Sequence, residues 1–240
     1  MRLDAATFLL QWSTGGLAFL WFTLRSKEIS LGYSKLLRAT YGVLAALGVA
    51  AGFYFDRVLI REVAGIVVAG IAFATFAKRE SRTDLSAVAV GAVGLIGSVV
   101  ASGGGLVDLL RVLVGAAFLG AITDLMLLGH WYLVQPGLPR RHVNDIVRTF
   151  LVIWPLEVIV MLIPTGMFSV FSGSVDDGWN GQLGWFWAAC AVTTGVLSVV
   201  TLKALQERAY SAVMAATGLM YLAILTAFGT DLVARAVLAG

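Results

Sequence analysis

Apolar residues occur along this chain in long continuous runs, separated by short clusters of charged and turn-forming residues. A helix needs about 20 apolar residues to cross the hydrocarbon layer of a bilayer, and the runs have roughly this length. They do not alternate between apolar and polar residues with a period of two, which excludes the strands of a membrane barrel. We therefore predict an all-α, polytopic membrane protein of about eight transmembrane helices. These spans cover approximately residues 5–24, 36–55, 62–77, 85–102, 107–134, 146–168, 183–202 and 209–233.

The amino-acid composition agrees with this pattern. Of the 240 residues, 59% are hydrophobic and only 13% are charged, whereas a soluble domain is about half apolar and about a quarter charged. No connection between the spans is long enough to fold separately, so we expect a single integral membrane domain over residues 1–240. Whatever the protein does must then occur within the bilayer, at its two surfaces or through a partner chain.

The basic residues gather in alternate connections between the predicted spans. Twelve of the 17 Lys and Arg residues lie in the connections around 25–38, 78–82, 140–148 and 203–208. The opposite connections carry fewer basic residues and include the acidic segment SVDDGWN at 174–180. Since cytoplasmic connections are enriched in Lys and Arg, we expect both termini on the non-cytoplasmic side of a bacterial cytoplasmic membrane.

Weak internal similarity suggests a duplication. A shift of 110 residues aligns FLWFTL at 19–24 with GHWYLV at 129–134, and Arg38 with Arg148. The halves 1–104 and 105–240 would then be two parallel four-helix repeats, because an even number of spans returns the chain to the same side. Transporter folds often place their substrate between such repeats. The alternative is that apolar segments resemble one another by composition alone.

Two acidic residues lie deep inside predicted spans. Ionisable residues in the bilayer are costly and mark functional sites by default, which singles out Asp124 and Glu157. At 1.5 Å per residue, both lie about 14–15 Å from the expected inner boundary, on consecutive antiparallel helices. Pro155 removes a hydrogen bond near Glu157 and predicts an interrupted helix of the kind that lines transporter cavities. We therefore predict a substrate or proton path formed by Asp124, Glu157, Pro155 and Thr123.

The alternative for both acids is a structural role. Each carboxyl group could accept a hydrogen bond from a donor on a neighbouring helix and merely fix the packing. The candidate donors are Thr123, Thr193, Thr194 and Tyr41.

A histidine and two aromatic residues close the fifth span. His130, Trp131 and Tyr132 precede a turn that contains two prolines and two arginines. They could contact a ligand, with His130 as a single axial haem ligand or as a hydrogen-bond partner of a quinone. The only other histidine, His142, lies in the aqueous turn, which disfavours a bis-histidine haem. The alternative is that Trp131 and Tyr132 belong to the aromatic belt at the membrane interface.

Few patterns in the sequence indicate an enzyme or a metal site. There is no P-loop, no H-E-x-x-H and no G-x-S-x-G. The one cysteine, Cys190, can form neither an intrachain disulfide nor a cysteine-based metal site. Two carboxylates without a positioned histidine leave the identity of any metal open. We expect no catalytic residue, no resident cofactor and no nucleic-acid partner, since the basic connections explain the net charge of +3.

The stretch LLGHWYLVQPGLPRRH at 127–142 resembles segments of small bacterial multispan membrane proteins, and this resemblance implies no activity. Our first hypothesis is a small transporter or permease component that moves a cation, a proton-coupled solute or a small cationic molecule near Asp124 and Glu157. The second is a non-catalytic subunit, structural or quinone-facing, of a larger electron-transfer or other membrane complex. Under either hypothesis, the expected partners of the chain are the lipid bilayer and either further copies of the chain or other subunits. An intramembrane enzyme ranks last.

Overall fold

The computed structural model of the chain describes residues 4–78, 82–135, 137–163, 166–175 and 177–238. Within these ranges all regular secondary structure is helical, which confirms the predicted all-α fold. Parts of the basic connection at 78–82 and of the acidic segment at 174–180 lie outside the described residues. The helices found in these ranges are α1 (Ala5–Leu24), α2 (Leu31–Phe55), α3 (Leu59–Ala74), α4 (Thr83–Ala101), α5 (Leu106–Val134), α6 (Arg141–Leu162), α7 (Phe168–Phe171), α8 (Gln182–Ala204) and α9 (Tyr210–Leu238).

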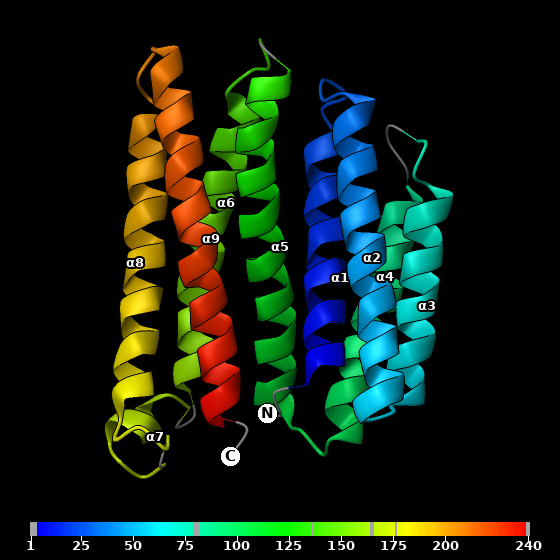
Figure 1. Ribbon diagram of the computed structural model, residues 1–240, viewed down its shortest axis with the longest axis vertical. Coiled ribbons are helices and arrows are strands. Elements are labelled where there is room, and N and C mark those ends of the chain that lie inside the picture. Colours follow the sequence, from blue (N-terminus) through cyan, green and yellow to red (C-terminus); the bar gives the residue numbers. More distant parts are fainter. Residues whose placement is uncertain (1–3, 79–81, 136, 164–165, 176, 239–240) are drawn as a thin grey trace.

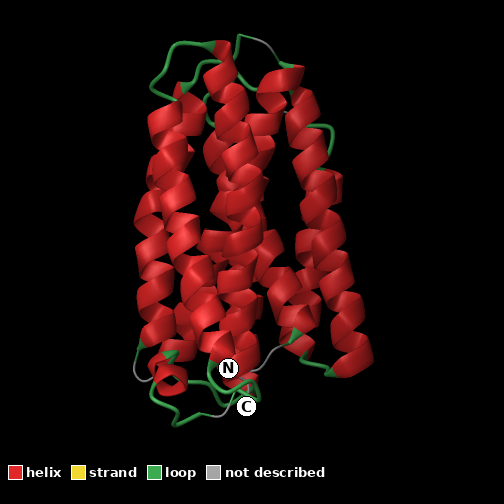
Figure 2. Ribbon diagram, turned by 60° about the vertical axis from the view of Figure 1, so that its left-hand side comes forward, coloured by secondary structure: helices red, strands yellow, loops and turns green. Residues whose placement is uncertain are grey.

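Apart from the short α7, the helices run along one axis and alternate in direction, so that both ends of the chain lie at the same end of the bundle (Figure 1). Figure 2 shows the connections gathered at the two ends of the helices. In the first half, α1 packs against α2 and α4, and α3 packs between those two helices. In the second half, α5 packs against α6 and α9, and α8 packs between them. The two groups of four helices meet where α1 packs against α5.

Five helices are long and apolar enough to cross a membrane, namely α2, α4, α5, α8 and α9. Large apolar side chains stand exposed on several of them, as with Leu47 at 52%, Val100 at 69% and Leu225 at 69%. Such a surface suits lipid and would be unusual for a soluble monomer. The fold is therefore membrane-like, and its apolar helices are compatible with an integral membrane protein.

Helix α6 differs in two ways from the predicted span at 146–168. It begins at Arg141, because a run of polar residues continues the helix beyond the apolar stretch. It also runs through Pro155 without a break and ends at Leu162. The interrupted helix predicted around this proline is therefore not found in the described part of α6.

An acidic residue caps each of two helix starts. The Asp4 carboxylate accepts a hydrogen bond from the Ala6 N–H at the start of α1. Before α8, the Asp177 carboxylate accepts backbone hydrogen bonds of 2.8–2.9 Å from Trp179, Gly181 and Leu183. Desolvation raises the pKa of the Asp177 carboxyl, but these backbone donors outweigh it and hold the pKa below its ordinary value.

Glycines bring α1 and α5 into direct backbone contact. A Cβ added to Gly15 would lie 1.7 Å from the Ala116 carbonyl oxygen, and one added to Gly120 would lie 2.2 Å from the Gly15 carbonyl carbon. Real Cβ atoms do not approach other atoms so closely, so only glycine fits at either position. Small residues allow this close approach between membrane helices, where packing replaces the hydrophobic effect as the main attraction. The centre of the molecule is therefore closed by a tight helix crossing.

Candidate functional site

Asp124 is fully buried on α5, and its hydrogen-bond donors come from the first half of the chain. The Thr23 hydroxyl donates to one carboxyl oxygen at 2.5 Å, and the Tyr33 hydroxyl donates to the other at 2.8 Å. The same Tyr33 hydroxyl lies 3.2 Å from the Asp124 carbonyl oxygen. This carboxyl group therefore has donors of the kind that the packing alternative requires, although they are not the donors named from the sequence.

The four donors proposed from the sequence have other surroundings. Thr123 donates to the Leu119 carbonyl oxygen at 2.7 Å and accepts a hydrogen bond from the indole of Trp12 at 2.9 Å. Thr123 thus fastens α5 to α1 beside Asp124. Thr194 bonds to Cys190 and Thr226. Thr193 is exposed, and the Tyr41 hydroxyl is buried without a hydrogen-bond partner among the described residues.

Glu157 is also fully buried, and its environment is different. Neither carboxyl oxygen has a hydrogen-bond donor among the residues that the structure describes. The charged groups that act on it are Asp231 and Arg235 from α9 and Arg111 from α5. Helix α8 also packs against α6, but it carries no Asp, Glu, Lys or Arg before Lys203. Glu157 is therefore a buried acid without a hydrogen-bond donor among the described residues, in a cluster of charged side chains.

An ion pair on α9 forms the centre of this cluster. The Arg235 guanidinium donates to the Asp231 carboxylate from Nε at 2.6 Å and from Nη2 at 3.2 Å. The Gln11 side chain on α1 accepts from Arg235 Nη2 and donates to Asp231 at 3.4 Å. Gly115 on α5 leaves the space, since a Cβ there would lie 2.5 Å from the Gln11 amide nitrogen. Four helices, α1, α5, α6 and α9, thus contribute to one buried polar site.

The second arginine near Glu157 is engaged with the backbone of α6. Arg111 donates to the carbonyl oxygens of Val160 at 2.9 Å and Ile163 at 2.8 Å, at the end of that helix. Its remaining terminal nitrogen lies 3.5 Å from the Asp108 carboxylate. Arg111 therefore satisfies the last carbonyl groups of α6, with Asp108 as its counter-ion.

The structure does not bring Asp124 and Glu157 together, contrary to the depth expected from the sequence. Asp124 lies ten residues before the end of α5, and Glu157 lies sixteen residues after the start of α6. At 1.5 Å per residue these distances are about 15 Å and about 24 Å from the same end of the bundle. The error arises because α6 begins at Arg141, five residues before the predicted span. The two carboxyl groups belong to separate sites, and their proposed roles stay predictions.

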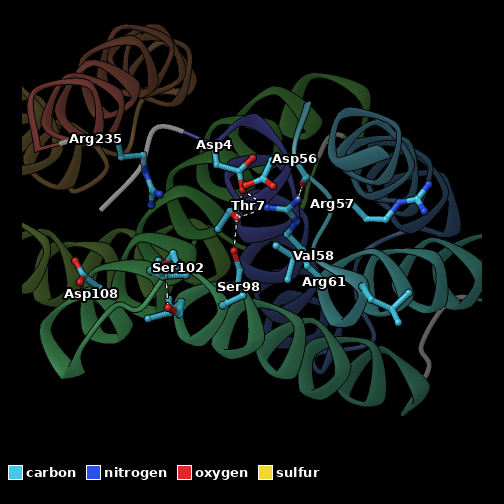
Figure 3. A pocket seen from close by; sticks show the side chains of 14 residues that line it. Asp4, Thr7, Asp56, Arg57, Val58, Arg61, Ser98, Ser102, Asp108 and Arg235 are labelled. Carbon is cyan, nitrogen blue, oxygen red and sulfur yellow. Dashed lines mark hydrogen bonds and ion pairs between the residues drawn. The ribbon is translucent and has the colours of Figure 1, made fainter. Parts of the chain in front are cut away.

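A cavity of about 470 Å³ opens at the end of the bundle where both termini lie. Arg61 on α3 lies at one side of it, where it is bonded to Asp4 and Thr7 (Figure 3). Arg61 also bonds the neighbouring Glu62 carboxylate. Arg235 reaches the cavity from α9 on the other side, as Figure 3 shows. Arg235 therefore contacts both the cavity and the buried Asp231 carboxylate.

A second cavity, of about 330 Å³, lies at the opposite end of the bundle. It is lined by the end of α1, including Thr23, and by the first residues of α6. The Glu28 carboxylate bonds Arg141 and lies 2.6 Å from the His142 ring nitrogen beside this cavity. Since Thr23 also bonds Asp124, each of the two buried acidic sites has a cavity at its own end of the molecule.

The side chains of His130, Trp131 and Tyr132 do not converge. The exposed His130 ring lies 3.2 Å from the Tyr221 hydroxyl on α9, whereas Trp131 donates to Ser30 at 3.2 Å. Tyr132 donates to the Pro139 carbonyl oxygen in the turn that follows α5. Trp131 and Tyr132 thus hold the connections at this end of the bundle. A haem or quinone contact at His130 stays a prediction.

Sequence reasoning missed the residues that surround Glu157. Asp231 and Arg235 form an i, i+4 acid–base pair at the end of the last predicted span, where such a pair is equally typical of the surface. Gln11 gives no signal in the sequence, because a lone amide in a predicted span has no pattern.

Within the described ranges, no three His, Cys, Asp or Glu side chains gather as metal ligands. Comparisons with known protein families, with curated proteins and with solved structures find no match for this chain.

Proposed function

We propose that the chain is a small multispan membrane transporter, or a permease component, that moves a cation, a proton-coupled solute or a small cationic molecule past Glu157 and Asp124. The observation that carries this proposal is Glu157, whose two carboxyl oxygens are buried with no hydrogen-bond donor among the described residues. Burying an unpaired carboxyl group is costly, and such groups inside membrane helices are retained for function. A purely structural residue at this position would not need to be acidic.

The two cavities support a path along the α1–α5 contact. One cavity contacts Arg235 near Glu157, and the other contacts Thr23 next to Asp124. Between the two sites, α1 and α5 meet backbone to backbone at Gly15 and Gly120. This arrangement corresponds to a transporter whose central crossing separates the two sides, with one acidic site facing each side.

The finer membrane topology is part of the same proposal. We take the eight long helices as spans, with α1, α3 and α6 accompanying the five that are long and apolar by themselves. We take residues 1–104 and 105–240 as parallel repeats, supported by the equivalent positions of α1 and α5 within their four-helix groups. The basic connections then lie in the cytoplasm, and both termini lie outside it.

Flux through reconstituted protein tests this proposal. Full-length protein is placed in liposomes that contain the pH indicator pyranine, and pH, Na⁺, K⁺ and tetramethylammonium gradients are imposed one at a time. We expect a flux above that of empty liposomes, and we expect Asp124→Asn and Glu157→Gln each to reduce it to the empty-liposome level. Glu207→Gln, which alters an exposed glutamate after α8, serves as the matched control and should keep the flux. Unchanged flux in both buried-acid variants would remove the path.

A further inference from the structure

Glu157 and Asp231 are neighbouring carboxyl groups inside the helix bundle. Asp231 acts on Glu157 both by its charge and as a side-chain hydrogen-bonding neighbour. For a hydrogen bond between two carboxyl groups, one of them must carry a proton. Without that proton neither group has a hydrogen to donate, which explains why both Glu157 oxygens lack a donor among the described residues. Both side chains are completely buried, so bulk water does not replace the missing donor.

The charges in the cluster determine which group holds the proton. Asp231 accepts two hydrogen bonds from the Arg235 guanidinium and one from Gln11, so it is stabilised as the carboxylate. Arg111 has Asp108 as its counter-ion. Three carboxyl groups thus face two guanidinium groups, and an ionised Glu157 would leave one buried negative charge without compensation. A single bound proton on Glu157 restores neutrality.

We propose that Glu157 and Asp231 form a binding site for one proton, which resides on Glu157 and is donated in a hydrogen bond to the Asp231 carboxylate, and that H⁺ is the coupling ion of the transporter. The second part rests on the function proposed above. Binding converts the Glu157 carboxylate to the carboxylic acid, and release returns the proton to water in the cavity lined by Arg235. No other atom changes its bonds.

A proton fits this site better than Na⁺ or K⁺. A metal ion requires several oxygen ligands around one point. Here the Asp231 oxygens are held by Arg235, and two guanidinium groups act on Glu157. Arg235 thus occupies the Asp231 oxygens, and neither guanidinium group supplies a ligand for a metal cation, whereas a proton becomes part of the carboxyl group and needs no further ligands. Arg235 also contacts the 470 Å³ cavity, which gives the site a connection to the aqueous surface.

Infrared absorption by protonated carboxyl groups tests the site directly. Spectra of the full-length protein in lipid nanodiscs are recorded at pH of about 7.5, where exposed carboxyl groups are ionised. We expect the wild type to show a carboxylic-acid band that Glu157→Gln removes and that the matched control Glu207→Gln retains. Asp231→Asn should also remove the band, because two carboxyl groups then face two guanidinium groups and Glu157 ionises as the counter-ion of Arg235. Replacing choline chloride with NaCl at constant pH should leave the wild-type band unchanged.

Three results would overturn the proton site: the same band in wild type and Glu157→Gln, an unchanged band in Asp231→Asn, or loss of the band when Na⁺ is added. Circular dichroism of each variant confirms that its helices are intact. The two proposals fail separately. A band from Glu157 in a wild-type protein that shows no flux would support the proton site and refute the transporter. Flux that depends on Glu157 in a protein without the band would support the transporter and refute the proton site.

Discussion

The contact between α1 and α5 makes a quantitative prediction about Gly120. A Cβ at this position would lie 2.2 Å from the carbonyl carbon of Gly15, 2.3 Å from its oxygen and 2.7 Å from the nitrogen of Gly16. All three atoms belong to the backbone of α1, so no side-chain rotation can relieve the overlap. Ordinary contact begins near 3.4 Å, so Gly120→Ala must push the two helices apart by about 1 Å.

The expected cost follows from two opposing effects. Overpacking of this kind costs about 1–3 kcal/mol, and the rigid backbone partner favours the upper end of that range. Alanine is favoured over glycine within a helix by about 1 kcal/mol, which offsets part of the cost. We therefore expect Gly120→Ala to lower the free energy of unfolding by about 2 kcal/mol.

Unfolding in mixed micelles by increasing amounts of SDS, followed by circular dichroism, measures this difference. The matched control is Gly218→Ala on α9, because beyond the adjacent backbone of its own helix no described atom lies within 4 Å of a Cβ at that position. The control should unfold at the same SDS fraction as wild type or at a higher one. A Gly120→Ala protein as stable as Gly218→Ala would refute the close helix crossing.

Three further predictions concern other parts of the molecule. Asp84→Asn should lower the free energy of unfolding by about 3–5 kcal/mol in the same titration, because it leaves the fully buried Arg38 on α2 without its carboxylate partner. Replacing both Arg38 and Asp84 by apolar residues should lower the free energy of unfolding much less. Because the pKa of Asp177 is lowered, the stability that this cap contributes is present above the ordinary aspartate pKa and is lost as pH falls through the lowered pKa. Asp177→Asn should therefore speed proteolysis of the loop before α8 at neutral pH. Equal rates for the variant and the wild type would contradict the cap. In a Cys190→Ser background, an impermeant thiol reagent applied to whole cells should label Ser102→Cys but not Glu207→Cys, and the reverse result would invert the proposed topology.

Much of the fold is predictable because hydropathy runs determine where helices can be buried in lipid. The predicted ranges 5–24, 107–134 and 183–202 differ from the bounds of α1, α5 and α8 by two residues or fewer. Hydropathy does not determine where a helix ends in the aqueous phase, where polar residues form helices equally well. For this reason α6 starts five residues before its predicted span, and Glu157 lies deeper than expected.

The candidate site was only partly predictable for a related reason. A buried acid is visible in the sequence, so Asp124 and Glu157 could be selected as residues of interest. Their partners depend on which helices pack together, and this information is absent from a single sequence. Thr23 and Tyr33 are ordinary residues until α1 packs against α5 and the Tyr33 hydroxyl at the start of α2 reaches Asp124. Gln11 likewise gains its role only where α1 approaches α9.

Proton flux in liposomes that contain Glu157→Gln, compared with Glu207→Gln under the same pH gradient and membrane potential, tests the central claim most directly. Both variants exchange a glutamate for its neutral isostere, and they differ only in whether the acid is buried beside Asp231 or exposed at the end of the bundle. Our account predicts flux at the empty-liposome level for Glu157→Gln and wild-type flux for Glu207→Gln. Equal flux in the two variants would contradict a transport path through Glu157.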